Sequence, residues 1–391
     1  MTDVDHLILG GGPAGSRAAQ AIRKRDPRSR IVLVGEEPHP FPNRIVLSKE
    51  FLTSDIPAER AVVLPAAAFE QRGIELLLSR RVTRLDPDAR TVELADGARL
   101  AWERCLVATG SRPLALPVPG FDLPGVHVLR TVADAAAIRS AARAADRAVV
   151  IGGGLIGAEV ACALAANGLR VTLVAREPWL WGHLAPEPVG RTAGAILARG
   201  GIELLAARTV VAIHRDGRDM AVETAEGDAL SAPLIVAGVG VRPNTDFLTG
   251  TDLLDAAGGI RTNARLETGA PGIWAAGDVA AFEDPVLGAR HRVEHWLHAQ
   301  HQGRSAGENM SGESRAYARV SAYDTHLFDV PVTVAGAPPL AGRWTEEEPF
   351  RDGSGTALGW CEERLVAAYR IGAGSIDVLL RRIEAGAMTP G

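Results

Sequence analysis

Two glycine-rich segments carry the clearest chemical signal in the chain, GGGPAG at residues 10–15 and GGGLIG at residues 152–157. Each follows an apolar run and precedes helix-forming residues, which is the strand, turn and helix context of a dinucleotide-binding loop. The first glycine permits the tight turn, the second lets the backbone approach a pyrophosphate, and the third lets the helix pack closely on the strand. The pyrophosphate then lies at a helix N-terminus, where unpaired N–H groups favour negative charge. Two such loops predict two dinucleotides and hydride transfer between them, because a nicotinamide and a flavin are a natural donor and acceptor.

Each loop is expected to begin a βαβ unit whose second strand ends at a residue that contacts a ribose. In the first unit the strand 31–34 is followed by Glu36 and Glu37, and carboxylates there favour a free 2′-OH, as in the adenosine of FAD. In the second unit, residues 174–176 read Val-Ala-Arg, with no carboxylate at the expected position 175. Because the guanidinium of Arg176 follows at once, the pattern predicts a 2′-phosphate and NADPH as the preferred donor. The alternative is that Arg176 is only an exposed surface residue.

Length and composition limit the remaining possibilities. The 391 residues are 47% hydrophobic and 23% charged, as in an ordinary globular protein of two or three domains, and the net charge of −5 gives no argument for nucleic acid binding. Residues 1–5 lead straight into the first strand and no apolar stretch reaches a membrane span, so we expect a cytoplasmic protein without membrane contact. No metal site is expected. The three cysteines form no CxxC pair, which argues against a disulfide relay beside a flavin.

The segments around the loops predict the domain organisation. Residues 83–100 read as hairpins, while the apolar strands in 105–113 and 234–244 look like paired hinges between the two nucleotide-binding units. A further apolar strand at 273–276 precedes Gly277 and Asp278, and the tail reads as short strands followed by a helix at 375–384. We therefore expect an FAD-binding domain at 1–117 and 245–318, an NAD(P)H-binding domain at 118–244, and a small α+β domain at 319–391.

The order of motifs, GGGPAG, ATGSRP, GGGLIG, GVGVRPN and IWAAGD, resembles the two-dinucleotide flavoprotein reductases of the glutathione reductase structural group. Within that group, FPNRIVLSKEFL at 41–52 and RVEHWLHAQHQGRSAGENMSG at 292–312 are similar to the FAD-dependent ferredoxin and rubredoxin reductases and to apoptosis-inducing factor. The resemblance implies an α/β fold with two Rossmann-like domains and a small α+β C-terminal domain, in a monomer or homodimer. It also implies hydride transfer from NAD(P)H to flavin N5, followed by single-electron transfer to a ferredoxin or rubredoxin that serves an oxygenase or similar enzyme.

The resemblance also assigns roles to particular side chains. Asp278 would hydrogen-bond the ribityl chain of FAD, and Lys49 would lie near flavin N5 and pair with Glu159 to stabilise the reduced flavin and orient the nicotinamide. His295 and Trp296 would lie beside the isoalloxazine, and Glu294 would approach the nicotinamide. Lys49, Glu159 and Trp296 are the expected catalytic residues. The expected cofactor-binding residues are Gly10, Gly12, Pro13, Ala14, Gly15, Glu36, Glu37, Arg44, Lys49, Val82, Ala108, Thr109, Gly110, Arg130, Gly152, Gly154, Leu155, Ile156, Gly157, Arg176, Gly240, Gly277, Asp278, Glu294, His295 and Trp296.

The chain departs from these reductases where they face the electron acceptor. Ile45 and Val46 replace a double proline, and VSAYDTHLFDV at 320–330 replaces an aromatic segment of typical ferredoxin reductases. Two other functions therefore stay open: an NAD(P)H oxidase or quinone reductase, and a redox-sensing flavoprotein similar to apoptosis-inducing factor. Five arginines would attract an acidic ferredoxin, unless they are merely solvated surface residues: Arg290, Arg292, Arg304, Arg315 and Arg319.

Overall fold

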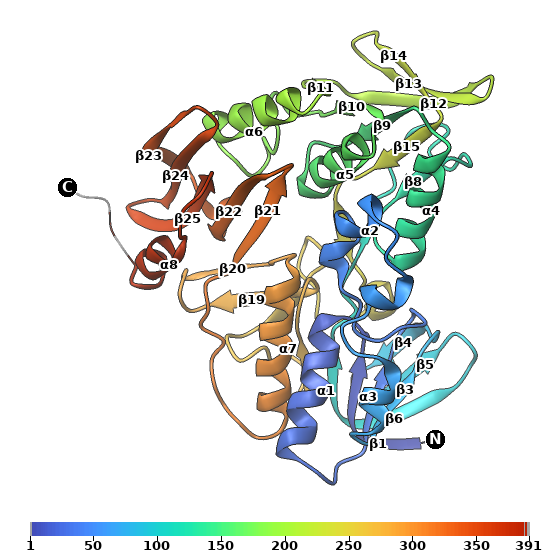
Figure 1. The fold of residues 1–391 in the computed structure, drawn as a ribbon. Helices are drawn as coiled ribbons and strands as arrows, with labels where there is room; N and C mark the ends of the chain where they lie inside the picture. The colour runs from blue at the N-terminus through green and yellow to red at the C-terminus, as the bar shows by residue number, and fades with distance from the viewer. Residues whose placement is uncertain (1, 387, 389–391) are drawn as a thin grey trace. The chain divides into compact units, whose positions relative to one another are not determined.

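The computed structural model of the chain describes residues 2–386 and 388 (Figure 1). The chain forms two compact units, each assembled from separate segments. The first unit comprises Met1–Asn43, Glu59–Arg112 and Arg242–Arg319, and the second comprises Arg44–Ala58, Pro113–Val241 and Val320–Gly391. This division differs from the three predicted domains, because residues 44–58 and the C-terminal segment group with the second glycine loop. The boundaries of a separate third domain stay a prediction.

The first unit is built on a mostly parallel sheet with the strand order β3-β2-β1-β6-β5-β4. Strand β5 pairs with the first residues of β6, and β18 pairs with its last three residues. The strands β1, β2, β3, β6 and β18 run parallel, and β4 and β5 form an antiparallel edge. The central strands read as continuous apolar runs because both faces of the sheet are covered. The bounds are β1 (Thr2–Leu9), β2 (Ile31–Val34), β3 (Ile74–Leu77), β4 (Val82–Asp86), β5 (Thr91–Leu94), β6 (Arg99–Val107) and β18 (Ile273–Ala275).

Two long helices, α1 (Pro13–Arg25) and α7 (Trp296–Met310), pack side by side in the first unit (Figure 1). Small residues allow this contact, because a Cβ added at Gly303 would lie 2.0 Å from the carbonyl oxygen of Ala14. The remaining elements are α3 (Ala66–Glu70), the 3-10 turns η2 (Ala58–Ala61) and η3 (Asp246–Leu248), and a small sheet of β17 (Ile260–Thr262), β19 (Ala280–Asp284) and β20 (Ala289–His291).

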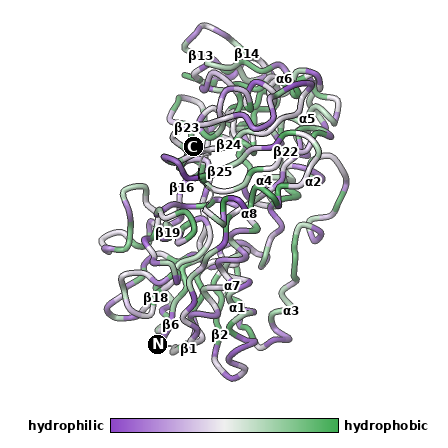
Figure 2. Tube along the Cα trace, turned by 90° about the vertical axis from the view of Figure 1, so that its left-hand side faces the viewer, coloured by the Kyte–Doolittle hydropathy of each residue, from purple (hydrophilic) through white to green (hydrophobic). Residues whose placement is uncertain are grey.

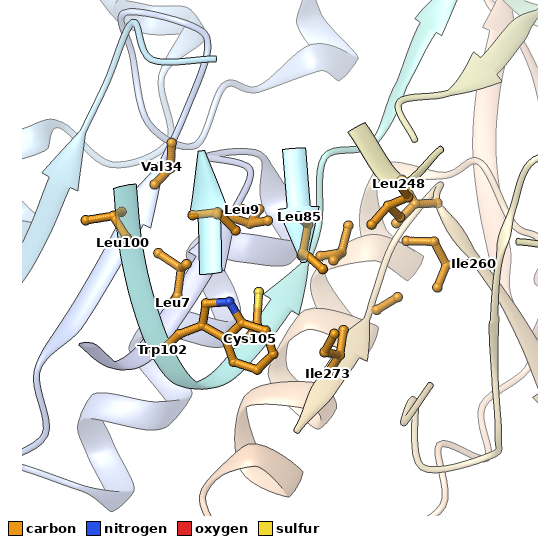
Figure 3. Close-up of a cluster of buried hydrophobic side chains, with 14 of the residues drawn as sticks. Leu7, Leu9, Val34, Leu85, Leu100, Trp102, Cys105, Leu248, Ile260 and Ile273 are labelled. Atoms are coloured by element: carbon orange, nitrogen blue, oxygen red, sulfur yellow. The ribbon is translucent and has the colours of Figure 1, made fainter. Parts of the chain in front are cut away.

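A buried cluster fills one side of the first sheet (Figure 3). Leu7, Leu9, Trp102 and Cys105 come from β1 and β6, and Ile273 comes from β18. Each of these side chains is almost completely removed from water. Their burial stabilises the ends of the strands from which the first glycine loop and Asp278 emerge.

The second unit repeats the nucleotide-binding architecture. Its parallel sheet has the order β11-β10-β9-β15-β8 and carries the helices α4, α5 and α6. Helix α4 begins with a capping box in which Thr131 and Asp134 bond each other's backbone N–H groups. The bounds are β8 (Val126–Val128), α4 (Val132–Arg143), β9 (Arg147–Ile151), α5 (Leu155–Ala166), β10 (Arg170–Val174), α6 (Glu187–Arg199), β11 (Ile202–Leu205) and β15 (Leu234–Ala237), with an added sheet of β12 (Val210–Asp216), β13 (Asp219–Thr224) and β14 (Ala229–Ala232).

Segment 44–58 also belongs to the second unit and contains η1 (Arg44–Val46) and the single turn α2 (Glu50–Thr53). The C-terminal residues form an antiparallel sheet with the order β21-β22-β25-β24-β23, followed by α8. The short strands predicted for the tail are confirmed, and the helix predicted at 375–384 corresponds to α8, which begins two residues later. The bounds are β21 (Ala322–Leu327), β22 (Val330–Gly336), η4 (Pro338–Leu340), β23 (Arg343–Arg351), β24 (Ser354–Cys361), β25 (Arg364–Ile371) and α8 (Asp377–Glu384).

The two predicted hinge segments contain β7 (Ser111–Pro113) and β16 (Val241–Pro243), which pair with each other. Their role as hinges stays a prediction. Over the described residues, no helix is long and apolar enough to cross a membrane, and hydrophilic stretches interrupt the hydrophobic ones along the whole trace (Figure 2). Within the same residues, no group of three or more His, Cys, Asp or Glu side chains could hold a metal ion.

Candidate dinucleotide-binding sites

The first glycine of each loop has a backbone conformation that side chains rarely adopt. Gly10 has φ +118° and Gly152 has φ +114°. A Cβ at Gly10 would lie 2.1 Å from the carbonyl oxygen of Ala108, and one at Gly152 would lie 2.3 Å from that of Gly238. The predicted requirement for glycine at the tight turn is confirmed in both loops.

The third glycine of each loop permits close packing of helix on strand. A Cβ at Gly15 would lie 1.9 Å from the Gly10 carbonyl oxygen, and one at Gly157 would lie 2.0 Å from that of Gly152. Both distances are far below any van der Waals contact. The predicted packing role of these two glycines is therefore confirmed as well.

The middle glycines, Gly12 and Gly154, are the N-caps of α1 and α5 and have ordinary φ values of −71° and −81°. A Cβ at Gly12 would meet nothing within 4 Å, and one at Gly154 would meet only the Gly238 oxygen at 3.8 Å. The protein's own packing therefore does not explain these glycines. Neither helix has an acidic residue in its first turn. Open space beside the N–H groups of a helix N-terminus fits a diphosphate that approaches the backbone.

The two units share the same hydrogen-bond register at the end of the second strand. Gly35 donates its N–H to Leu77 and accepts from the N–H of Arg80, both at 2.9 Å. Ala175 makes the same pair of bonds, with Leu205 and Arg208, again at 2.9 Å. Ala175 is thus the counterpart of Gly35.

Arg176 is therefore the counterpart of Glu36. The sequence pattern expected the carboxylate at position 175, whereas the register matches Glu36 with position 176. The assignment of Arg176 to a nucleotide stays a prediction. The main chain continues the match, since the carbonyl oxygens of Glu37 and Glu177 each accept an N–H from the segment that follows the next strand, at 3.3 Å and 2.9 Å. The sequence analysis did not single out Glu177. Its match with Glu37, which follows Glu36 in the first unit, is the signal that could have identified it.

The side chain of Arg176 is 77% exposed and forms an ion pair with Glu177 at 3.1 Å. Glu177 itself is only 19% exposed. The nearby guanidinium of Arg208 is held by Asp228 at 2.6 Å. Arg176 is accordingly an exposed cation after β10, whereas Glu36 at the same register in the first unit is a carboxylate.

Asp278 follows β18 and is held by polar contacts within the first unit. The Ser111 hydroxyl donates to Asp278 Oδ2 at 2.6 Å, and the N–H of Gly277 donates to Gln302 Oε1 at 2.8 Å. Gly277 has φ +79° and is buried, so glycine is needed there. Gln302 Nε2 is buried without a hydrogen-bond partner among the residues that the structure describes. An unsatisfied donor beside Asp278 fits a polar ligand at this place.

The segment Glu294, His295 and Trp296 lies at the N-terminus of α7, with His295 as the N-cap. The Trp296 indole donates to the Pro42 carbonyl oxygen at 3.2 Å, and its ring lies 6.0 Å from that of Phe41. Glu294 is exposed and pairs with Arg292 at 3.0 Å. These contacts fix the indole, which is the predicted flavin neighbour, against the strand-to-helix loop of the same unit.

Two residues after Trp296, in the first turn of α7, His298 is almost completely buried. Burial holds its pKa well below the ordinary value, and the electrostatic interaction with neighbouring histidines acts in the same direction. A 3.3 Å hydrogen bond joins its Nδ1 to the Tyr317 hydroxyl. The base of this helix therefore carries a neutral imidazole near neutral pH.

In the second unit, Lys49 and Glu159 form an ion pair with Nζ and Oε1 3.1 Å apart. The predicted pairing is confirmed. The Ser48 hydroxyl donates to Glu159 Oε2, and the Thr325 hydroxyl donates to Oε1. The side chains of Glu159 and Lys49 are only 10% and 24% exposed. Lys49 is one of only two lysines in the chain, the other being Lys24.

The predicted site residues are divided between the units, and their assignment to a cofactor stays a prediction. The second unit contains Arg44, Lys49, Arg130, the residues of the second loop, Glu159, Arg176 and Gly240. Arg44 donates a hydrogen bond to the Arg130 carbonyl oxygen, and Ile156 is exposed in the first turn of α5. The first unit contains Gly10, Gly12, Pro13, Ala14, Gly15, Glu36, Glu37, Val82, Ala108, Thr109, Gly110, Gly277, Asp278, Glu294, His295 and Trp296.

The cysteines are all free. Cys105 is buried, which raises the pKa of its thiol, and burial raises the pKa of Cys162 to about 11. Cys361 is exposed. Buried thiols with raised pKa values are poor nucleophiles, so the arrangement offers no disulfide relay for electrons.

Comparison with known proteins places these observations in context. The model of the family described as pyridine nucleotide-disulphide oxidoreductase matches residues 4–303. The anthranilate 1,2-dioxygenase system ferredoxin–NAD(+) reductase component of Burkholderia cepacia is 35% identical over 390 residues, which cover 98% of this chain and 94% of that protein. The ferredoxin reductase for the CYP199A2 system from Rhodopseudomonas palustris has a TM-score of 0.89 at 27% identity and covers 98% of each chain. The covalent putidaredoxin reductase–putidaredoxin complex has a TM-score of 0.88 at 26% identity, covering 98% of this chain and 93% of that chain.

Proposed function

We propose that this chain takes electrons from NADPH and delivers them to an acidic iron–sulfur protein. The chain belongs to the pyridine nucleotide-disulphide oxidoreductase family and is an FAD-dependent NAD(P)H oxidoreductase of the ferredoxin reductase type. The α/β fold with two dinucleotide-binding units agrees with the prediction and with the similar solved structures. The Burkholderia cepacia relative is named as a component of a dioxygenase system, and we extend such a role to this chain.

Bound FAD supplies the conversion of a two-electron hydride into single electrons. The protein's own contribution is binding and electrostatics. We assign Asp278, oriented by Ser111, to the hydrogen bonds with the ribityl chain, and Gly12 to the approach of the diphosphate. We assign Lys49, paired with Glu159, to stabilising negative charge on the reduced flavin. The free cysteines have no role in this scheme.

The observation that carries the choice of NADPH is the register match between Glu36 and Arg176. A carboxylate at this register accepts the ribose 2′-OH, whereas a guanidinium forms charge-assisted hydrogen bonds with a 2′-phosphate. Arg176 is exposed and bonded only to its neighbour Glu177 among the described contacts, so it can turn toward a phosphate without breaking a buried network.

The test compares kcat/KM for NADPH and NADH in Arg176→Glu. Hydrogen bonds to charged groups contribute about 1.5–3 kcal/mol, so the NADPH to NADH ratio should fall by about 10- to 100-fold. Arg170→Glu is the matched control, because Arg170 lies on the same strand β10 and pairs with Asp146. A wild-type preference for NADH, or an unchanged ratio in Arg176→Glu, would remove the assignment.

A cluster of positive charge in the first unit supports an acidic partner. Burial and then the charge of Arg304 lower the pKa of Arg17. Burial, and then the charges of Arg319 and Arg304, lower the pKa of His301. Arg304 and Arg319 are exposed, and neither has a hydrogen-bond or ion-pair partner within the described part of the chain. Like charges held together in this way raise the association rate of an acidic protein.

The side chains of the other three predicted arginines have hydrogen-bond or ion-pair partners within the protein. Arg290 donates to the Thr262 carbonyl oxygen at 2.8 Å, Arg292 donates to that of Asp278 at 3.1 Å, and Arg315 pairs with Glu313 at 3.2 Å. We therefore narrow the proposed docking surface to Arg304 and Arg319, with Arg17 and His301 beside them.

An acidic [2Fe–2S] ferredoxin from an oxygenase system is the probe for this surface. Arg304→Glu should lower the kcat/KM for ferredoxin reduction by about tenfold at low salt and flatten its salt dependence, because a rim charge acts mainly on association. Arg315→Glu serves as the control. Oxidation of NADPH at a rate that no such ferredoxin changes would favour an oxidase or quinone reductase instead.

A further inference from the structure

We propose that the C-terminal sheet takes part in the Lys49–Glu159 site: Thr325 of β21 is a positioning residue that fixes the Glu159 carboxylate and, through it, the Lys49 ammonium. The assignment rests on the proposed function only in that Lys49 and Glu159 act on the bound cofactors. It gives a role to the part of the chain that departs most from the ferredoxin reductases.

Glu159 is the single charged residue of α5, and its carboxylate needs partners because it is almost buried. The donors come from two separate segments. Lys49 and Ser48 lie in segment 44–58, and Thr325 lies in the C-terminal sheet. Lys49 and Thr325 share Oε1, while Ser48 bonds Oε2, so the three donors together determine how the carboxylate is rotated.

Burial and packing of β21 hold the Thr325 side chain in place. Thr325 is only 2% exposed. Strand β21 packs against α5, the helix that carries Glu159. The Phe328 ring covers Gly200 at the end of α6, where a Cβ would lie 1.9 Å from it. Strand β21 and the turn that follows it thus pack against α5 and the end of α6.

The backbone of segment 44–58, which carries Lys49, is held by contacts that do not involve Thr325. Arg139 lies over the Phe51 ring at 4.2 Å and donates to the Ile56 carbonyl oxygen at 2.9 Å, while Asn167 donates to that of Leu52 at 2.8 Å. Loss of the Thr325 hydroxyl should therefore leave segment 44–58 folded. It should free the Glu159 carboxylate to rotate and so displace the head group of Lys49.

The two lysines of the chain make this displacement visible. Reductive ¹³C-methylation of the holoenzyme labels Lys24, which is exposed, and Lys49, together with the N-terminal amine. In Thr325→Val the NMR signal of Lys49 should move toward that of Lys24, and in Thr325→Ser it should stay near its wild-type position. Thr333→Val is the matched control, because Thr333 of the same sheet donates to Asp324 at 2.6 Å and not to Glu159.

Stopped-flow reduction of the flavin by NADPH, without ferredoxin and without oxygen, gives the second readout. Thr325→Val should lower the limiting reduction rate by about tenfold, since small misplacements of a catalytic group are costly, and should change the nucleotide Kd less than twofold. In a Glu159→Gln background the same substitution should have less than a twofold effect.

An unmoved Lys49 signal with a reduction rate within twofold of wild type would overturn the proposal. An equal loss in the Glu159→Gln background would also overturn it, because Thr325 would then act only on the fold. If Thr325→Val does not fold, Thr325→Ala is measured in the same way. These assays contain no protein acceptor, so their outcome is separate from any failure of the proposed ferredoxin reduction.

Discussion

The hydroxyl of Ser111 and the carboxylate of Asp278, 167 residues apart in sequence, form a 2.6 Å hydrogen bond in the first unit. The bond joins the segment that leaves β6 to the residue that follows β18. These strands are paired in parallel, with Val107 opposite Ala275, so their carboxyl ends reach the same edge of the sheet. Ligands of open α/β sheets bind at such edges, which supports the proposed place of the flavin ribityl chain.

Asp278→Ala should therefore weaken FAD binding by about 10- to 100-fold, because hydrogen bonds to a charged group are lost. Ser111→Ala should weaken it less, since the carboxylate stays and only loses its orientation. The flavin to protein absorbance ratio of the purified variants, followed by FAD titration of the apoprotein, measures both effects. Thr249→Ala, an exposed change in the same unit, is the control. Full flavin occupancy in Asp278→Ala would contradict the assignment.

Gly12→Ala and Gly15→Ala should fail in different ways. A Cβ at Gly12 meets no protein atom, so this variant should fold normally but bind FAD more weakly because the methyl group occupies the approach of the diphosphate. A Cβ at Gly15 would overlap the Gly10 carbonyl oxygen, so this variant should lose several kcal/mol of stability or fail to fold. Circular dichroism and FAD titration separate the two results. Equal FAD affinity in Gly12→Ala and wild type would argue against a diphosphate at this loop.

The first unit should lose stability in mild acid because of His6. This residue is fully buried on β1, and neither ring nitrogen has a partner among the described residues. Burial, and then the charge of Arg104, lower its pKa from 6.5 to about 4. Between these two values the unfolded chain binds a proton that the folded chain does not, so stability falls as the pH decreases from 6.5 toward 4.

The contribution of His6 to this loss should be about 2 kcal/mol at pH 4.5 relative to pH 7.5. Urea unfolding of wild type and His6→Leu at the two pH values measures it. The variant should show the smaller pH dependence, whereas His214→Leu, at an exposed position, should behave as wild type. Parallel pH profiles for wild type and His6→Leu would show that His6 is protonated in the folded state.

Electron transfer should proceed without any thiol. At pH 8, iodoacetamide should label only Cys361 in the native holoenzyme, because burial raises the pKa of both other thiols. The labelled enzyme should reduce its flavin at the wild-type rate, and Cys361→Ser should remain unlabelled. Mass spectrometry locates the label. A change in the number of free thiols between oxidised and NADPH-reduced protein would reveal a disulfide relay.

The glycine loops could be recognised from the sequence because their constraints are local. A left-handed φ at Gly10 and a carbonyl oxygen 1.9 Å from a Cβ at Gly15 exclude every other residue, whatever lies further away. The same holds for Gly277. Strands such as 31–34 were also predictable, since a fully buried parallel strand needs a continuous apolar run.

The residue that matches Glu36 in the second unit was harder to predict from the sequence. Counting along the chain placed the expected carboxylate at position 175, whereas the hydrogen bonds of Ala175 with Leu205 and Arg208 make Arg176 the counterpart of Glu36. The place of segment 44–58 in the chain suggested the first unit, whereas its contacts group it with the second unit. Arg139 and Asn167, far along the sequence, bind its backbone and bring it into the second unit.

The sequence alone predicted two dinucleotide-binding loops in an α/β fold, because glycine spacing is a property of short segments, and its resemblance to flavoprotein reductases predicted the class of activity. Only the tertiary structure decided which side chains meet: Ser111 with Asp278, and Thr325 with Glu159. Such pairs join segments more than 100 residues apart, and no local preference of either segment specifies its partner. Strand pairing and helix packing over the whole unit create them.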